Sequence, residues 1–319
     1  MNPPVALTIA GTDSGGAAGT AADLATFAAL GVHGACVITA VTAQDTTGVS
    51  DIHPVPHATI EAQLDAVLDD LPIAAIKTGM LGTAAAVEAV AQRVVKLRVT
   101  YSPLSASQPA VVVDPVLVAT SGAVLGGEDV RRAYLDHLLP VATVVTPNLD
   151  EARALAGHDG TPEQLAEELV FLVGRAASAS ERVETNTVPI ERRDGRIGLD
   201  TAPPSGSGGS TSGVTGGSTS GATVIVTGGD PAATGSCTDW LAEPGKQPIP
   251  LTHPAVPTSN DHGTGCTYSS ALAAHLAHGA TLHKAAEQAA AYVTQQLRAS
   301  KTWTLGRGRG PIAHTKETR

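Results

Sequence analysis

A glycine-rich turn that contains a thiol stands out in residues 260–279, NDHGTGCTYSSALAAHLAHG. Glycines just before a helix let the backbone N–H groups of its first turn point at an anion, which the helix dipole favours. Gly263, Thr264, Gly265 and Cys266 are therefore candidates for a phosphate cradle. The alternative is a tight turn that needs glycine for a positive φ. A nucleophilic cysteine is a weaker interpretation, because nothing in the sequence places a base beside Cys266.

Two carboxylates are predicted at the edge of the sheet where open α/β folds bind their ligands. Asp114 ends the run VVVD, and Glu151 lies one helical turn after Asn148 in TPNLDEARAL. Asn148 is placed to cap a helix, and a carboxylate alone is more often a solvated or capping residue. A carboxylate beside a bound phosphate repels it unless Mg²⁺ lies between them. Together with a phosphate cradle, the pair predicts a site for a magnesium nucleotide.

Two further stretches carry weaker signals. The loop GTDSGGAAGTAAD at 11–23 follows a predicted strand, but it has neither the G-x-G-x-x-G spacing nor the lysine of a P-loop. A strand-to-helix turn without a ligand explains this loop equally well. Gln44, in VTAQDTTGV, follows another strand and carries the donor and acceptor that suit the edge of a heterocycle. An exposed glutamine with no ligand is the usual case at such a position.

The pattern of apolar residues predicts the elements that must position these groups. Near-continuous apolar runs alternate with amphipathic helical segments, which predicts an α/β fold with a mostly parallel sheet covered on both faces. The predicted strands are VALTIA (5–10), ACVITAVTA (35–43), IAAIKTGML (73–81), PAVVVDPV (109–116), ATVVTPN (142–148) and ATVIVTGGD (222–230).

This regularity breaks near residue 174. Residues 205–221 are Gly, Ser or Thr at 16 of 17 positions, a composition typical of flexible linkers. We predict a disordered surface insertion at about 175–221 within a single domain that spans 1–319. A boundary between two domains is the alternative, but the segment after the insertion holds only one or two predicted strands, too few for a separate sheet.

The composition excludes several classes of protein. The 319 residues include 20 Lys and Arg against 30 Asp and Glu, and few aromatic residues, so we expect no nucleic-acid partner. Cys36, Cys237 and Cys266 have no metal-ligand spacing and predict no disulfide framework. No apolar run approaches the roughly 18 residues of a membrane span, and the first residues lack a basic leader. We therefore expect a soluble protein in the reducing cytoplasm, with no membrane partner.

Taken in order, the motifs resemble the hydroxymethylpyrimidine/phosphomethylpyrimidine kinases of thiamine biosynthesis, which belong to the ribokinase-like superfamily. The resemblance covers about 5–157 and 222–314, and HGTGCT, TAQDTTGV and GML are specific to this group and its vitamin B6 kinase relatives. It implies a three-layer α/β/α fold and phosphoryl transfer from ATP, with Mg²⁺, to a hydroxymethyl group. The implied partners are an aminopyrimidine and ATP, and the resemblance is compatible with a homodimer.

The resemblance also implies roles for individual residues in the pocket of the pyrimidine ring. Gln44 is expected to hydrogen-bond the aminopyrimidine, in a pocket lined by Gly11, Asp23 and Met80. The turn at 263–266 is expected to form the anion hole. Its cysteine is expected to accept the proton of the substrate hydroxyl, since a helix N-terminus lowers the pKa of a thiol.

On the nucleotide side, the resemblance places Asn148, Thr227 and Gly229 beside ATP, and Asp114 and Glu151 at the metal. The family usually has a lysine where Thr227 stands, and the first glycine-rich loop is also altered. Two alternatives therefore stay open. One is a pyridoxine-type kinase of the same fold, and the other is a pyrimidine-binding protein that has lost ATP.

Overall fold

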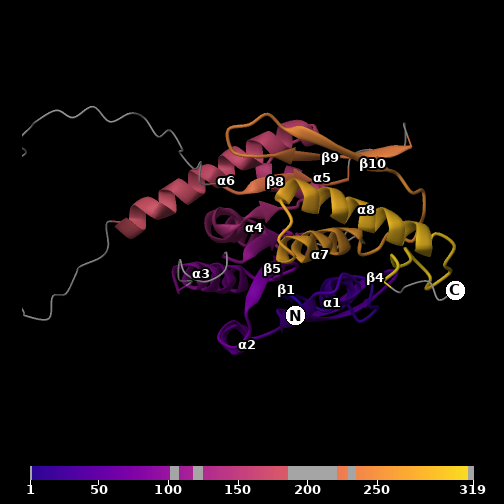
Figure 1. Cartoon of the computed structure of the whole chain (residues 1–319). Coiled ribbons are helices and arrows are strands. Elements are labelled where there is room, and N and C mark those ends of the chain that lie inside the picture. Colours follow the sequence, from indigo (N-terminus) through magenta and orange to yellow (C-terminus); the bar gives the residue numbers. More distant parts are fainter. Residues whose placement is uncertain (1, 101–107, 118–124, 186–220, 229–234, 315–319) are drawn as a thin grey trace, which may run out of the picture.

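The computed structural model describes residues 2–100, 108–117, 125–185, 221–228 and 235–314 (Figure 1). Most strands belong to one large sheet: β1 (Val5–Ala10), β2 (His33–Ile38), β5 (Ile73–Thr78), β6 (Ala110–Val113), β7 (Val144–Val145), β8 (Thr223–Val226), β9 (Ser236–Ala242) and β10 (Ile249–Pro254). Their order is β10-β9-β8-β7-β6-β5-β1-β2. All pairs from β2 to β8 are parallel, and β9 and β10 add an antiparallel edge. The predicted α/β fold with a mostly parallel sheet is confirmed.

Helices cover both faces of this sheet, which gives three layers (Figure 1). One face is covered by α1 (Gly19–Ala29), α7 (Thr264–Ala277) and α8 (Leu282–Ser300). The other face is covered by α2 (His57–Leu68), α3 (Ala84–Thr100), α4 (Glu128–Ala133), α5 (Leu149–Ala156) and α6 (Pro162–Thr185). None of the helices in the described part of the chain has the length and apolarity that a membrane crossing requires.

Alternation along the buried strands assigns each residue to one of the two faces. Leu7 and Ile9 of β1 belong to the cluster under α2–α6, whereas Ala6 belongs to the cluster under α1, α7 and α8. Successive side chains of a strand point to opposite faces, so a strand buried on both sides must be apolar throughout. Ala6 and Ala75 are small, and α7 offers the equally small Ala271 to the same cluster. Small residues on both partners let α7 pack closely on the sheet, which fixes the position of its N-terminus.

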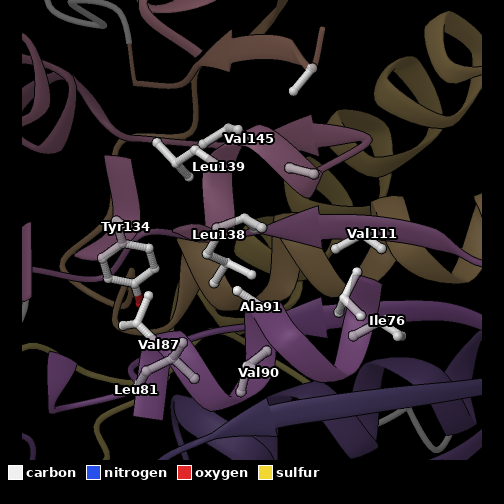
Figure 2. Packing of buried hydrophobic residues seen from close by; sticks show 14 of the residues in the cluster. Ile76, Leu81, Val87, Val90, Ala91, Val111, Tyr134, Leu138, Leu139 and Val145 are labelled. Carbon is white, nitrogen blue, oxygen red and sulfur yellow. The ribbon is translucent and has the colours of Figure 1, made fainter. Parts of the chain in front are cut away.

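The opposite layer is irregular at one point that reaches the site. After α4, the chain continues as a π turn, Tyr134–Leu138, and a 3-10 turn, Leu139–Val141. The helical segment that begins with α4 thus changes its winding before it ends. Tyr134 is fully buried in the cluster (Figure 2), and its hydroxyl donates to the carbonyl oxygen of Gly79 at 3.2 Å. This bond ties the turn after β5 to the core.

One predicted strand, 35–43, is wrong as a single element. It divides at Thr39 into β2 and a separate strand, β3 (Ala40–Asp45), which pairs with β4 (Gly48–Pro54) in a two-stranded hairpin. The Thr39 N–H group still donates to Ala10 of β1, whereas its carbonyl oxygen accepts from Val55, just after β4, so the chain leaves the large sheet at this residue. Beyond this point buried and exposed residues alternate, as expected for a hairpin with one free face.

The start of the predicted insertion also differs from the structure. Helix α6 continues to Thr185 and so occupies the first part of the range predicted to be disordered, 175–221. Residues 186–220 lie outside the described residues. The strands that come after the insertion, β8 to β10, extend the same sheet as β1 to β7.

Candidate active site

A cleft of about 630 Å³ runs along the carboxyl ends of the parallel strands. Five of its lining residues come within two positions of the end of β1, β5, β6, β7 and β8 in turn: Gly11, Gly79, Asp114, Thr146 and Thr227. The N-terminus of α7 closes the cleft from one face of the sheet. This is the edge at which open α/β sheets bind ligands, as the sequence predicted.

The predicted phosphate cradle lies in this cleft, since residues 263–266 all line it. Helix α7 begins at Thr264, and among the described residues no side chain caps it. Gly263 has a φ of 89°, and a Cβ atom there would lie 1.8 Å from the carbonyl oxygen of Ala17. The turn therefore needs glycine at 263 for its conformation and for its close contact with the first loop. This satisfies the tight-turn interpretation. The Thr264 N–H group donates to Asp261 at 3.3 Å, and those of Gly265 and Cys266 remain as the candidate donors to an anion.

The first glycine-rich loop is held by Asp13, which the sequence analysis did not single out. Its carboxylate accepts hydrogen bonds from the N–H groups of Gly15 at 2.8 Å, Ala17 at 3.0 Å and Ala18 at 2.8 Å. Burial alone would raise the pKa of Asp13, but hydrogen bonds from His262, Ala18 and Gly15 hold the pKa below its usual value. The loop is thus built around a buried anion, and its place in the cleft is fixed.

Three of the residues predicted for the ring pocket come together. Gln44, Gly11 and Met80 all line the cleft. A Cβ atom on Gly11 would lie 2.4 Å from the terminal methyl of Met80, so these two residues are in close contact. The side-chain nitrogen of Gln44 lies 3.1 Å from Nε2 of His262. Gln44 therefore has a polar neighbour that its sequence context did not indicate.

Asp23 does not line the cleft, and its predicted place in the ring pocket is wrong. The side chain is fully buried, and its carboxylate accepts from the hydroxyls of Thr8 and Ser270, both at 2.6 Å. It also pairs with the ammonium group of Lys77, at 2.9 and 3.0 Å from the two carboxylate oxygens. With its acceptor sites already used inside the core, Asp23 supports the site from beneath instead of contacting a ligand.

Lys77 is a buried cation under the cleft. Burial alone would lower its pKa, but Asp23, Cys266 and Asp114 raise it above the usual value and keep the lysine charged. Its Nζ atom lies 3.9 Å from the carboxylate of Asp114, which also accepts from the hydroxyl of Ser269 at 3.0 Å. The motifs do not indicate this group, and its signal in the sequence is a single lysine in the otherwise apolar strand IAAIKT.

Asp114 and Glu151 both line the cleft, and each is 4% exposed. Burial raises the pKa of both carboxyls, and the charge of Asp114 raises that of Glu151 further. The predicted cap is confirmed, because Asn148 and Glu151 form reciprocal hydrogen bonds at 2.9 and 3.0 Å. No group of three or more metal-ligating side chains occurs among the described residues. Two carboxylates with substrate phosphates are nevertheless a usual donor set for Mg²⁺, so this pair fits that ion.

On the nucleotide side, Asn148, Thr227 and Gly228 line the cleft, and Gly229 lies outside the described residues. The N–H group of Thr227 donates to Pro147 at 2.9 Å, which joins the end of β8 to the start of α5. The N–H group of Gly228 donates to the carboxylate of Asp239 at 3.1 Å.

The segment 306–312 lies at the end of the cleft that is lined by Gln44. The N–H groups of Arg307 and Gly308 donate to the hydroxyl of Thr46, in the turn between β3 and β4, at 3.0 and 3.1 Å. Arg307 also pairs with Asp45 at 2.9 Å, and Arg309 pairs with Asp261 at 2.8 Å. The segment therefore ties the hairpin to the turn that precedes α7.

Comparison with known proteins decides the family. A family model described as phosphomethylpyrimidine kinase matches residues 13–175 and 217–313. The chain belongs to this family. It is 40% identical to the hydroxymethylpyrimidine/phosphomethylpyrimidine kinase of Synechococcus elongatus over 316 residues, which covers 98% of both chains. Identity to the kinase of the same name from Rhizobium meliloti is 37%, over 97% of this chain and 96% of the relative.

Solved structures agree with this assignment. The pyridoxal kinase of Bacillus subtilis in its ADP complex matches with a TM-score of 0.72 and 28% identity, over 98% of this chain and 97% of the other. The phosphomethylpyrimidine kinase of Clostridium difficile matches with a TM-score of 0.64 and 27% identity, over 92% and 98%. The ribokinase-like fold and the kinase class that the motifs implied are therefore confirmed.

The electrostatics of this kinase differ from the expectation for Cys266. Burial raises the pKa of its thiol to about 12 against the lowering by the charge of Lys77, and the carboxylates of Asp114 and Asp23 add to the increase. The expected lowering of the thiol pKa by the helix N-terminus is wrong. At neutral pH the thiol is protonated and is not a general base.

Most charged groups that line the cleft are carboxylates, and this affects how the cleft can bind a nucleotide. Among the described lining residues Arg309 carries the one guanidinium, and it already pairs with an aspartate. The carboxylates of the lining are those of Asp13, Asp114, Asp150, Glu151, Asp239 and Asp261. A polyphosphate in such a cleft needs a cation at its own charges, in addition to backbone N–H groups.

Proposed function

We propose that this kinase transfers the γ-phosphoryl group of ATP to the hydroxymethyl group of 4-amino-5-hydroxymethyl-2-methylpyrimidine, and then phosphorylates the resulting monophosphate. The proposal rests on the set of residues that one cleft brings together. It holds Gln44 with Gly11 and Met80, the uncapped start of α7, and the pair Asp114 and Glu151. These are a surface for a flat polar ring, a set of donors for an anion, and two ligands for a cation.

The cradle at 263–266 acts on the transferring phosphoryl group. Phosphoryl transfer passes through a loose transition state with charge spread over the equatorial oxygens, so positioning and electrostatics dominate. First-turn N–H groups of a helix have no acceptor within the helix. Those of Gly265 and Cys266 are therefore available to the phosphoryl oxygens, and they need no reorganisation when the charge develops.

Asp114 and Glu151 would hold Mg²⁺, which supplies neutralisation of the phosphate charge when it is bound. Their raised pKa values are consistent with this role, since a cation between two buried carboxylates relieves their repulsion. Asn148 and Thr227 would lie beside the nucleotide. The absence of a lysine at 227 leaves the phosphate charge to the metal ion and the backbone amides.

We propose that Cys266 contributes to phosphoryl transfer through its backbone N–H group and not through its thiol. With a pKa of about 12, only about one molecule in 10⁵ carries a thiolate at pH 7. A loose transition state asks little of a base, because the nucleophile has lost little of its proton when the phosphoryl group moves.

The test is an assay of hydroxymethylpyrimidine with Mg-ATP in which mono- and diphosphate products are resolved. We expect both products, and Gln44→Ala should raise the KM of the pyrimidine more than that of ATP. The loss of a neutral hydrogen bond corresponds to about 0.5–1.5 kcal/mol. An unchanged pyrimidine KM in the variant would place the ring elsewhere.

A pyridoxal kinase is the second candidate, because the solved relatives at 28–29% identity include pyridoxal kinases. A larger kcat/KM for pyridoxal than for the pyrimidine would favour it. No ADP release with either ring would indicate a binding protein without kinase activity. The homodimer and the cytoplasmic location remain predictions, and sedimentation and cell fractionation would test them.

A further inference from the structure

A line of polar contacts joins Gln44, His262 and Asp13 at the end of the cleft where we place the substrate ring. The side-chain nitrogen of Gln44 lies 3.1 Å from Nε2 of His262, and the same Nε2 atom lies 3.4 Å from the carboxylate of Asp13. His262 is 8% exposed and Asp13 is 6% exposed, so water competes little with these contacts. All three residues line the cleft.

Hydrogen bonds hold all three residues of this line in place. The N–H group of His262 donates to Gly310 at 3.0 Å, and its carbonyl oxygen accepts from the N–H group of Ile312 at 3.0 Å. Asp13 is fixed by the loop N–H groups described above. The main chain of Gln44 is fixed as well, because it exchanges two 2.8 Å hydrogen bonds with the hydroxyl of Ser14. The side-chain amide of Gln44 is thus the part that can still turn.

The two neighbours of His262 Nε2 make opposite demands on this atom. An amide nitrogen only donates, so it needs an unprotonated Nε2, whereas a carboxylate only accepts, so it needs a proton there. The nitrogen and oxygen of an amide occupy equivalent positions, so a half-turn of the Gln44 amide brings Oε1 to His262 without a change of shape. A buried anion at 3.4 Å favours the proton on Nε2. In that state His262 donates to Oε1, and the Gln44 nitrogen takes the other position of the amide, which lies 3.5 Å from the hydroxyl of Thr42.

We propose that His262, held by Asp13, is a positioning residue that sets the order of donor and acceptor that Gln44 presents to the substrate ring. The inference rests on the proposed function and goes beyond it by naming a determinant of ring selectivity. With Oε1 tied to His262, the Gln44 N–H groups face an unprotonated ring nitrogen, and the second lone pair of Oε1 accepts from an adjacent amino group. An aminopyrimidine has both groups side by side, whereas a hydroxypyridine lacks the amino group.

The experiment compares wild type, His262→Ala and His262→Gln, with the pyrimidine and with pyridoxal as alternative substrates. His262→Ala should raise the pyrimidine KM about 2- to 10-fold, the effect of one neutral hydrogen bond. The same variant should leave the ATP KM unchanged. It should also reduce the ratio of kcat/KM for the pyrimidine to kcat/KM for pyridoxal. His262→Gln keeps a side-chain N–H donor and should recover part of the loss. His278→Ala, at the opposite end of α7 and outside the cleft, is the matched control and should change neither KM.

A double-variant comparison separates positioning from a direct or merely structural role. In a Gln44→Ala background, His262→Ala should add nothing to the pyrimidine KM, because His262 acts through the amide. An additional increase of the same size, or a fall in kcat with unchanged pyrimidine KM, would overturn the inference. Calorimetric binding of the pyrimidine to the same variants gives an independent readout. If wild type binds the ring but forms no phosphorylated product, the proposed function fails while the His262 inference is still tested.

Discussion

The contact between the two glycine-rich loops predicts a sharp difference between Gly263→Ala and Gly265→Ala. Both glycines belong to the turn at the start of α7, and both variants keep every backbone N–H group. A Cβ atom on Gly263 would lie 1.8 Å from the carbonyl oxygen of Ala17, whereas one on Gly265 would meet nothing within 4 Å. Gly263 also has a φ of 89°, and Gly265 lies inside the helix.

The expected loss of stability follows from these two differences. An L-residue in the left-handed region costs roughly 1–2 kcal/mol. Relieving a 1.8 Å contact with a backbone oxygen requires a backbone shift, and overpacking of this kind costs typically 1–3 kcal/mol. Gly263→Ala should therefore lose about 2–5 kcal/mol of unfolding free energy. Gly265→Ala should be neutral or slightly stabilised, since alanine is favoured over glycine in a helix by roughly 0.5–1 kcal/mol.

Urea unfolding and ADP release measure the two effects separately. Because the shift at Gly263 displaces the cradle, we expect its kcat to fall at least about 10²-fold, as for the loss of one oxyanion donor. Gly265→Ala should retain a kcat near that of wild type. Equal stability of the two variants would refute the packing argument. A stable Gly263→Ala protein with full activity would show that the cradle does not depend on this turn.

Three further variants test the charges of the site. Cys266→Ala should keep at least about a tenth of the wild-type kcat, because the thiol is protonated and the N–H group is retained; a phosphorylated Cys266 peptide from wild type would contradict this. Burial and a neighbouring carboxylate raise the pKa of Glu151 in the folded state. Between its unfolded and folded pKa values, the folded protein therefore binds more protons than the unfolded chain, and its stability falls as the pH rises. Glu151→Gln keeps the acceptor of the helix cap without the charge and should melt higher than wild type at pH 8. Its advantage should shrink toward pH 5, and a difference independent of pH would count against the assignment. Lys77→Met leaves the buried carboxylate of Asp23 without its cation and should cost about 3–5 kcal/mol in chemical unfolding. Lys284→Met, which breaks an exposed pair, should cost less than about 1 kcal/mol.

The local pattern of apolar residues was sufficient to predict most strands of the sheet. Strands β1, β5 and β6 are buried on both faces, so each is a mostly apolar run that the sequence displays directly, interrupted only by Thr8 in β1 and by Lys77 and Thr78 in β5. The cap formed by Asn148 and Glu151 was predictable for the same reason, since its residues are three positions apart. Strands β9 and β10 gave no comparable signal, because their sequences SCTDWLA and IPLTHP mix polar and apolar residues.

Contacts between distant residues explain what the sequence could not predict. The family resemblance implied a ligand contact for Asp23, but Lys77, 54 residues later, holds it inside the core. Gln44 and His262 are 218 residues apart, and only the fold shows that they meet. The thiol pKa of Cys266 also depends mainly on its burial by the fold, and further on the charges of Lys77, Asp114 and Asp23, which are distant in sequence.

The position of α7 and α8 has a consequence for the chain during its synthesis. Strands β1, β5, β6 and β7 are complete once residue 145 has been made, but α7, which covers one face of them, begins at 264. At 5–20 residues per second, the intervening 118 residues take a ribosome roughly 6–24 s. For that interval the apolar side chains of Ala6, Ala75, Val112 and Val144 lack part of their cover, and such surfaces attract chaperones or other nascent chains. Because the same helix carries the phosphate cradle at its N-terminus, a chain that has shielded its core has also acquired its anion site, and a truncated chain lacks both.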